Sequence, residues 1–281
     1  MENKEWIEFC EKQIPELKNI YKKQTGKYLD LSNCKTLTEK IQWLKIYDSN
    51  PLKIKCSDKI LVREYCKSKL GVDLFIPIIG VWNSFDEIDF KKLPNDYVLK
   101  TNHGSHTNII VKNNNINKTI TKKKFNEWLS KDWSWWGKEM AYYPIKRKIF
   151  AEQFVKDKNK GELTDYKFLC FNGEPKYCQV ISNRGEKSFH LNYYDMDFKF
   201  VDISRTDVQN DKNSIDSVPK SFEKMKEYAR ILAQDFNFVR VDFYEINDKP
   251  YLSELTFFPA AGFQQYKNPE TDLLLGNMLK L

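Results

Sequence analysis

The sequence has few of the residues that build the commonest metal and nucleophile sites. Its six cysteines include no C-x-x-C pair and no repeated spacing, so neither disulfides nor a zinc site is predicted. Only three histidines occur, and none lies in an H-E-x-x-H motif. His103 and His106 also lack the acid and nucleophile partners of a serine-type triad. These absences argue against zinc-dependent and serine-type hydrolases.

Long apolar runs and a strong excess of one charge are also missing. No segment approaches the ~18 apolar residues of a membrane span, and the acidic N-terminus does not resemble a secretory signal. We therefore expect a cytoplasmic protein. The formal net charge is +7 in 281 residues, and no nucleic-acid recognition motif accompanies it. Small anionic partners such as nucleotides or nucleotide-sugars are expected instead of nucleic acid.

The most informative feature that is present is a patterned hairpin near the C-terminus. The segment VRVDFYEINDKPYLSELTFFP (239–259) alternates apolar and polar residues on both sides of a turn-forming Asn-Asp-Lys. If the hairpin is centred on Asp248, Asp242 lies opposite Glu254 and Arg240 lies opposite Thr256. Residues directly opposed across two strands have Cβ atoms roughly 4.5–5.5 Å apart. The pattern therefore predicts that these four side chains form one cluster.

Two carboxylates at that separation require an explanation. Asp242 and Glu254 repel each other unless one is protonated or a cation lies between them. A hard cation such as Mg²⁺, which also recruits phosphate oxygens, is one solution. A solvated strand face with a cross-strand charge cluster is the alternative, and this segment alone does not decide between them.

An upstream segment has the composition of a phosphate-binding loop. DYVLKTNHGSHTNIIVK (96–112) reads as strand, small polar loop and strand, with Lys100 near the end of the first strand. Gly104 and Ser105 in the loop could offer backbone N–H groups and a hydroxyl to phosphate oxygens. The sequence contains no G-x-x-x-x-G-K-[ST] motif, so the loop is not a P-loop. An ordinary hairpin with a long loop is the alternative.

Two further segments complete an ordered series. RKIFAEQFV (147–155) is an apolar strand with Glu152 where a connecting hinge would begin. TDYKFLCFNGEPKYCQVIS (164–182) is a hairpin that turns at an Asn-Gly pair and places Asp165 and Lys167 on one face. The chain thus presents a lysine strand, a flexible loop, a hinge strand, an Asp/Lys hairpin and finally the Arg-x-Asp and Glu-x-Thr hairpin.

This order of segments resembles that of the ATP-grasp superfamily, and the amino-acid sequences of the segments resemble its TupA-like branch. The matching segments are KTLTEKIQWLKIYDSNPL (35–52), SDKILVREYCKSKLG (57–71), PIIGVWNSFDEIDFKKLPNDYVLKTNHGS (77–105), DYKFLCFNGEPKYCQVIS (165–182) and FVRVDFYEINDKPYLSELTFFPAAGF (238–263). The resemblance implies an α+β protein with an ATP-grasp fold, in which two α+β subdomains clasp the nucleotide. It suggests a helical N-terminal region at 1–75, a lid subdomain with the glycine loop at 76–150 and a C-terminal subdomain with the metal hairpin at 151–281.

The resemblance also implies roles for individual residues, with ATP and Mg²⁺ as cofactors. Lys100, Gly104 and Ser105 would contact the ATP phosphates, and Glu152, Gln153, Phe154 and Val155 would frame the adenine. Asp165 would contact the ribose or the hinge, and Lys167 would be a second cation beside the nucleotide. Asp242, Glu254 and Thr256 would bind Mg²⁺, while Arg240 would act with Lys100 in catalysis by steadying the phosphoryl group. Thr256 stands where many ATP-grasp enzymes have Asn, and His106 and Thr107 stand where a second glycine pair is expected.

The first part of the chain is predicted to be helical. Apolar residues recur at helical spacing through much of residues 1–47, and 58–70 reads as a further helix with Ser57 as its N-cap. Lys59 and Arg63, one turn apart in that helix, could point into a nucleotide cleft. Ordinary helix-surface charge is the more conservative interpretation.

One aromatic and basic stretch has no single interpretation. WLSKDWSWWGKEMAYYPIKRK (128–148) concentrates Trp133, Trp135 and Trp136 beside two tyrosines and a basic run. Such a stretch could form a platform for a sugar ring or an anchor at a membrane surface. Core and helix packing is the more common role of aromatics at this density.

The resemblance implies an enzyme that uses ATP to join a carboxylate to an amine through an acyl phosphate. TupA-like relatives are associated with envelope polymers, which implies joining an amino acid or peptide to a uronic acid of a bacterial capsule or cell-wall glycan. The partners would be these small molecules, with peripheral association with the polysaccharide machinery. An ATP-grasp kinase that phosphorylates a sugar hydroxyl, a glycosyltransferase and a glycan-binding module are the alternatives.

Overall fold

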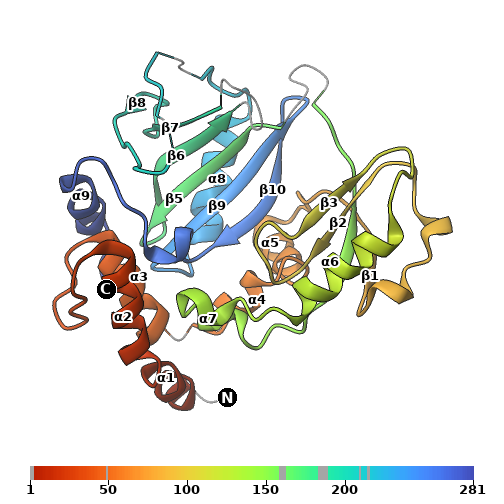
Figure 1. The fold of residues 1–281 in the computed structure, drawn as a ribbon. Helices are drawn as coiled ribbons and strands as arrows, with labels where there is room; N and C mark the ends of the chain where they lie inside the picture. Colours follow the sequence, from red (N-terminus) through yellow and green to blue (C-terminus); the bar gives the residue numbers. More distant parts are fainter. Residues whose placement is uncertain (1–2, 49, 158–162, 183–188, 209, 214–215) are drawn as a thin grey trace.

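A computed structural model describes residues 3–48, 50–157, 163–182, 189–208, 210–213 and 216–281. Two antiparallel β-sheets of different size lie side by side, with helices on their outer faces and at the N-terminal end (Figure 1). The predicted α+β class is therefore observed.

The smaller sheet is formed by the middle of the chain and has the strand order β1-β4-β2-β3. Its strands are β1 (Ile78–Trp82), β2 (Tyr97–Thr101), β3 (Asn108–Val111) and β4 (Ile149–Gln153). Helix α6 (Lys118–Ser130) covers it, and Phe125 of this helix packs in a cluster with Leu99 and Ile149. The segment PIIGVW (77–82) contains β1. The predicted division between residues 150 and 151 falls inside β4, whose hydrogen bonds tie it to this sheet.

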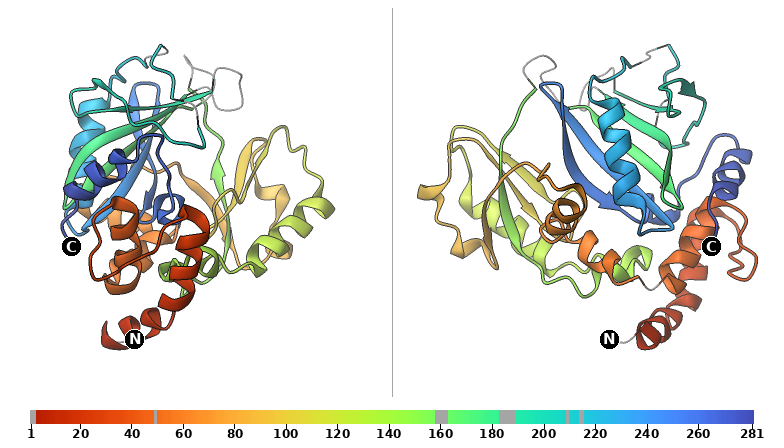
Figure 2. Two further views of the ribbon diagram at one scale, coloured as in Figure 1. Left: turned by 60° about the vertical axis from the view of Figure 1, so that its left-hand side comes forward. Right: turned by 180° about the vertical axis from the view of Figure 1, so that it is seen from behind.

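The larger sheet has the order β10-β9-β5-β6-β7-β8. Its strands are β5 (Asp165–Phe171), β6 (Glu174–Ser182), β7 (His190–Tyr194), β8 (Phe200–Val201), β9 (Phe238–Ile246) and β10 (Lys249–Thr256). Helix α8 (Phe222–Ala233) packs on one face against β5, β6 and β9 (Figure 2). Because this face is covered, the polar side chains of the central strands are concentrated on the other face.

The helical N-terminal region packs into the rest of the molecule and has no core that is wholly its own. It contains α1 (Asn3–Glu11), α2 (Ile14–Thr25), α3 (Leu37–Tyr47), α4 (Leu52–Ser57) and α5 (Val62–Leu70). Ile41 and Tyr65 belong to the same buried cluster as the larger sheet. Helix α3 packs against α9 (Glu270–Met278), and Lys40 donates to the backbone carbonyls of Gly276 and Leu279 at 2.9 and 2.7 Å.

The predicted helix over 58–70 is wrong at its start. Ser57 ends α4, and α5 begins only at Val62. The intervening turn is held by Asp58, whose Oδ1 accepts hydrogen bonds from the backbone N–H groups of Ile60 and Leu61 at 2.7 and 3.2 Å. Short polar side chains compete with helix formation in this way. Lys59 therefore lies in a turn instead of on a helix surface.

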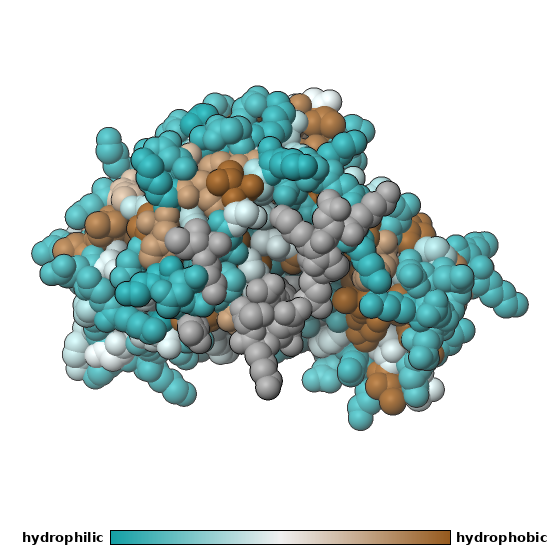
Figure 3. Space-filling view, turned by 90° about the horizontal axis from the view of Figure 1, so that it is seen from above, coloured by the Kyte–Doolittle hydropathy of each residue, from teal (hydrophilic) through white to brown (hydrophobic). Residues whose placement is uncertain are grey.

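Other expectations for the whole molecule can be compared with the structure. All six cysteines are free thiols, as predicted. None of the helices in the described residues is both long and apolar enough to cross a bilayer. The face above the two sheets is mainly hydrophilic, with hydrophobic side chains in small separate groups (Figure 3).

Candidate active site

A cavity of about 1480 Å³ lies between the two sheets. Its walls come from both sheets, from the loop after β2, from the turn that holds Lys59 and from the segment that follows β10. Sites for a single small molecule usually measure roughly 300–1,000 Å³. The cavity is therefore large enough for more than one ligand.

The C-terminal hairpin places its polar residues by means of a β-bulge. Asn247 and Asp248 have φ values of 51° and 64°, which gives a two-residue turn with Ile246 opposite Lys249. Continued without change, this register would place Ser253 opposite Asp242. The register shifts between Leu252 and Glu254, so Glu254 lies opposite Asp242 as predicted. The same shift brings Thr256 opposite Arg240.

Asp242 is the buried centre of this cluster. Its side chain has 0% exposure, and Arg240 binds both oxygens, with Nε–Oδ1 and Nη2–Oδ2 distances of 2.7 Å. Lys167 on β5 also donates to Oδ2 at 2.5 Å. Burial alone would lower the pKa of Arg240 and of Lys167, but the Asp242 carboxylate reverses the effect and raises both. Two cations thus share one fully buried carboxylate.

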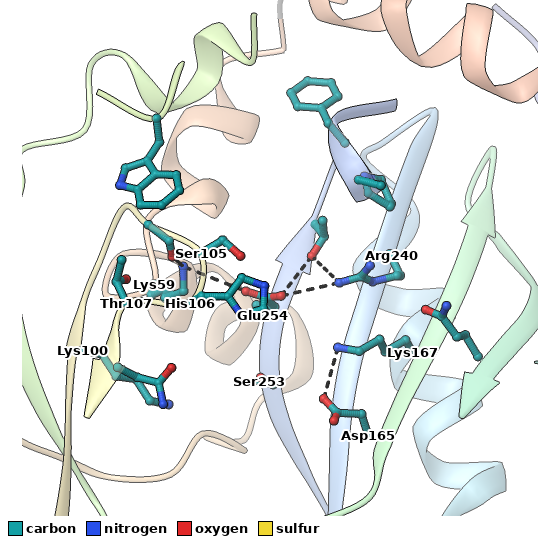
Figure 4. Close-up of a pocket in the computed structure, with 18 of the residues that line it drawn as sticks. Lys59, Lys100, Ser105, His106, Thr107, Asp165, Lys167, Arg240, Ser253 and Glu254 are labelled. Atoms are coloured by element: carbon teal, nitrogen blue, oxygen red, sulfur yellow. Dashed lines mark hydrogen bonds and ion pairs between the residues drawn. The ribbon is translucent and has the colours of Figure 1, made fainter. Parts of the chain in front are cut away.

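Glu254 is the carboxylate that faces the cavity. Its side chain is 35% exposed, and it lies 3.5 Å from Arg240 Nη2 and 4.0 Å from Lys59 Nζ. The Thr256 hydroxyl donates to its Oε1 at 3.3 Å. Burial would raise the pKa of Glu254, but Lys59, Lys167 and Arg240 together lower it to about 2. Glu254 is therefore ionised, with cations on both sides (Figure 4).

The smaller sheet contributes a second cluster of charges. The Glu152 carboxylate on β4 is paired with Lys100 on β2 and with Arg63 on α5. Arg63 also donates to the Ile76 carbonyl at 2.7 Å. Both Lys100 and Glu152 line the cavity, and the next three residues, Gln153 to Val155, line it where the chain leaves the sheet.

Lys59 is a cavity residue that the sequence interpretation placed on a helix surface. Its backbone N–H donates to the Asn102 carbonyl at 3.0 Å, and its Nζ donates to the Gly104 carbonyl at 2.6 Å. Desolvation by burial lowers the pKa of Lys59, and the Glu254 carboxylate opposes this effect. Lys59 therefore lies between the loop after β2 and the C-terminal hairpin. A helix boundary set by Asp58 was the signal that could have revealed it.

The loop between β2 and β3 is closely packed at its base. The hydroxyls of Thr101 and Thr107 are 2.7 Å apart, and a Cβ at Gly104 would lie 2.8 Å from the Thr107 side chain, which explains the glycine there. His106 has a φ of 57°, a left-handed conformation that glycine adopts more easily. His106, where a further glycine was expected, thus has the backbone conformation that a glycine would favour.

The structure brings the predicted site residues together around one cavity. Twelve of them line it: Lys100, Gly104, Ser105, Glu152, Gln153, Phe154, Val155, Asp165, Lys167, Arg240, Glu254 and Thr256. Asp242 lies behind this wall. Cavity residues that the sequence analysis did not identify include Glu139 and Arg205. Both lie outside the helices and strands, where no strand or helix period fixes the direction of a side chain.

The sequence model of the family described as TupA-like ATPgrasp matches residues 39–280 of the chain. The chain belongs to the TupA-like ATP-grasp family. A search of curated protein sequences finds no match.

Solved structures of ATP-grasp ligases resemble this TupA-like protein at low sequence identity. An L-amino acid ligase from Bacillus licheniformis is 14% identical, with 80% of this chain and 49% of that chain covered and a TM-score of 0.47. A D-alanine–D-alanine ligase from Helicobacter pylori is 15% identical, with 87% and 69% covered and a TM-score of 0.45. The corresponding ligase from Bacillus anthracis is 16% identical, with 72% and 57% covered and a TM-score of 0.44. The TupA-like chain thus spans little more than half of the Bacillus anthracis ligase.

Family membership confirms the predicted resemblance and the ATP-grasp fold. The two α+β subdomains on either side of the cavity are the smaller sheet with α6 and the larger sheet with α8. The position of each residue toward a nucleotide and the choice of substrates remain predictions.

Replacing Lys59 or Lys100 with Ala is expected to weaken ATP binding by the TupA-like protein, because a phosphate would lose a charge-assisted partner. Isothermal titration with ATP and Mg²⁺ measures this directly. Lys55, whose exposed side chain pairs with Glu64 at 2.8 Å, provides the matched control variant Lys55→Ala. Unchanged ATP affinity in both cavity variants would contradict the assignment of the loop to phosphate binding.

Proposed function

We propose that this protein is an ATP- and Mg²⁺-dependent carboxylate–amine ligase. The observation that carries the proposal is the charge arrangement of the cavity. Arg240 and Lys167 stand on the larger sheet, Lys59 and Lys100 stand on the other side, and the ionised Glu254 lies between them (Figure 4). Positive charge from both sides suits a triphosphate, while an exposed carboxylate among cations suits a metal ion that accompanies it.

Each group in the cavity has a proposed role toward ATP. Lys59, Lys100 and the backbone N–H groups of the loop at Gly104 and Ser105 would hold the phosphates. The strand end at Gln153 to Val155 would frame the adenine, and Asp165 would contact the ribose. The loop is tied to Lys59 through the Gly104 carbonyl, so phosphate binding at Lys59 would also reposition the loop.

The oxygen donors at the hairpin fit a Mg²⁺ ion. Glu254 is ionised and partly exposed, and the Thr256 hydroxyl lies 3.3 Å from it, so both could act as ligands. Asp242 would join them only if Lys167 moved away, because its two oxygens are bonded to Arg240 and Lys167. The ion would neutralise charge on the β- and γ-phosphates.

The proposed chemistry has two steps. The substrate carboxylate attacks the γ-phosphorus, which forms an acyl phosphate and releases ADP. Arg240 and Lys167 stabilise the negative charge on the transferred group, and the cavity walls align the reactants. An amine then attacks the acyl carbon and displaces phosphate.

The proposed substrates are a uronic acid of a bacterial capsule or cell-wall glycan and an amino acid or peptide, in the cytoplasm and with peripheral association with the polysaccharide machinery. Support comes from the rest of the cavity wall, which combines a guanidinium with amide and aromatic side chains: Arg205, Gln179, Gln264, Tyr193, Tyr266 and Trp136. Sites for small polar ligands commonly combine aromatic surface with a few placed hydrogen-bonding groups.

The test is incubation with ATP, Mg²⁺ and a panel of nucleotide-uronic acids and amino acids, followed by mass spectrometry. A product lighter than its two parts by one water is expected for ligation. A sugar heavier by one phosphoryl group would instead identify the kinase alternative. Transfer of the sugar with loss of its nucleotide would identify a glycosyltransferase.

A further inference from the structure

One part of the cavity wall has no role in the nucleotide chemistry described above. It is formed by Trp136 of α7 (Ser134–Gly137), by Glu139 and Tyr142, which follow α7, and by α3 and the segment Pro259–Gly262 after β10. This wall lies near the metal hairpin, because Glu254 and Arg240 both affect the pKa of Tyr142. Burial is the largest cause of the raised pKa of Tyr142, and Glu139 adds to it.

Glu139 is held in place by the backbone around it. A Cβ built on Gly137 would lie 2.9 Å from Glu139 Oε1 and 2.6 Å from the Ala261 Cβ. Only glycine leaves room for this arrangement, in which the carboxyl packs between α7 and the segment after β10. Glu139 is partly buried and lines the cavity.

Lys45 of α3 is the cation that acts on the pKa of Glu139, but its Nζ donates its hydrogen bonds to other groups. Its Nζ donates to Gln42 Oε1 at 2.8 Å, to the Gly137 carbonyl at 2.5 Å and to the Ala261 carbonyl at 2.7 Å. These three bonds join α3, α7 and the segment after β10 behind Glu139. In the described part of the chain, no cationic group lies within 4.0 Å of the Glu139 carboxyl. The carboxyl is thus free to receive a proton donor from the cavity.

The charged surroundings also suit proton transfer. Burial raises the pKa of Glu139, and the positive charge of Lys45 opposes the increase. The other titratable groups beside Glu139 are Lys45, whose own pKa is lowered by burial, and Tyr142, whose raised pKa keeps it neutral. Lys138 is paired away from Glu139 with Glu16 at 2.5 Å. General bases work best with a pKa near the operating pH.

We propose that Glu139 binds the amine substrate and removes a proton from it, an inference that rests on the proposed ligase function. The amine arrives as an ammonium ion, R–NH3⁺, and the Glu139 carboxylate takes one proton to give R–NH2. The nitrogen lone pair forms the C–N bond at the acyl carbon, and the C–O bond to phosphate breaks. The departing phosphate takes the second proton, which leaves one N–H in the amide.

The aromatic neighbours of Glu139 support a cationic ligand. Trp136 is 60% exposed, and its ring meets Phe263 edge-on at 6.2 Å, which fixes the indole while leaving a face open. Ring faces attract ammonium groups within about 6 Å. Trp135 and Arg147 do not share this position. Trp135 packs on Tyr143 at 6.3 Å, and Arg147 donates to the Leu129 and Ser130 carbonyls at 2.9 and 3.0 Å.

The test compares two nucleophiles in wild type and in Glu139→Gln. Hydroxylamine is largely uncharged at pH 7 and needs no base, so it traps an acyl phosphate as a hydroxamate. The carboxylate and the amino acid are the pair from the panel described above. We expect Glu139→Gln to form hydroxamate at the wild-type rate while its kcat for amide formation falls about 100-fold or more. The wild-type kcat/KM for the amine should level off once Glu139 is ionised, whereas the variant, which can use only the uncharged amine, should keep gaining rate with pH up to the pKa of the amine itself.

Controls separate this role from others. Glu16→Gln, which removes a carboxylate from the adjacent Lys138 pair, should leave both rates unchanged. Glu139→Asp, which keeps a carboxylate, should recover part of the amide rate and the pH dependence if Glu139→Gln is poorly folded. Equal losses of hydroxamate and amide, or an unchanged amide rate and pH profile, would overturn the role of Glu139. Absence of both products from wild type would instead overturn the ligase proposal itself, and this inference with it.

Discussion

Glu254→Gln is expected to reduce ATP-dependent turnover by about 100-fold or more, the effect seen when one electrostatic stabiliser of a transition state is removed. Glu254 is the ionised carboxylate of the hairpin with surface in the cavity, and its negative charge is what would hold Mg²⁺ between the phosphates and the protein. The amide in the variant keeps the shape and loses the charge. ADP release, measured at saturating ATP with Mg²⁺ varied, gives both kcat and the Mg²⁺ dependence.

The control for Glu254→Gln is Glu174→Gln, because Glu174 has an exposed ion pair with Arg230 at 3.1 Å and does not line the cavity. This control should retain wild-type turnover. The thermal unfolding temperature of Glu254→Gln should also stay close to that of wild type, since its side chain is partly exposed. Near-normal turnover of Glu254→Gln at saturating Mg²⁺ would show that Glu254 is not a metal ligand.

Asp242→Asn is expected to have the largest effect on stability, lowering the free energy of unfolding by about 3–5 kcal/mol. The fully buried carboxylate neutralises Arg240 and Lys167. Removing its charge takes away the nearest counterion of both cations, and leaves only the longer pairs of Lys167 with Asp165 at 3.2 Å and of Arg240 with Glu254 at 3.5 Å. Urea unfolding followed by circular dichroism measures the loss.

A second substitution tests the cause of this loss. Lys167→Met in the Asp242→Asn background removes one of the two cations that lost their nearest counterion, so the double variant should be more stable than Asp242→Asn alone. Additive destabilisation by the two substitutions would contradict the charge explanation. A loss below about 1 kcal/mol in Asp242→Asn would show that the pair behaves like an exposed ion pair.

The sequence predicted which residues of the hairpin cluster together, but it did not predict how deeply they are buried. Period-two alternation is strong over 239–257, so the four polar residues were assigned to one cluster, and the structure agrees. The pairing of Asp242 with Glu254 was nevertheless predicted from a turn centred on Asp248, whereas the structure has a two-residue turn and a bulge at Ser253. The burial of Asp242 was beyond prediction because it depends on Lys167, which comes from another strand 75 residues away.

Irregular segments account for most of what the sequence did not reveal. Lys59 was assigned to a helix because residues 58–70 have good helical composition, but the Asp58 carboxylate accepts a hydrogen bond from the Ile60 backbone N–H and overrides that tendency locally. Glu139 lies in a short segment with no period, where position is set by contacts with α3 and with residues after β10. Such contacts between distant segments carry no local signal in a single sequence.

The central claim is that a carboxylate is activated as an acyl phosphate, and oxygen transfer tests it most directly. The carboxylate substrate is labelled with ¹⁸O, the ligation is run with ATP and Mg²⁺, and the released phosphate is analysed by mass spectrometry. Because the carboxylate oxygen attacks the γ-phosphorus and leaves with it, each phosphate released should contain one ¹⁸O, in proportion to the amide formed. Amide formed together with unlabelled phosphate, so that the ¹⁸O lost from the carboxylate appears in water, would contradict the acyl-phosphate mechanism.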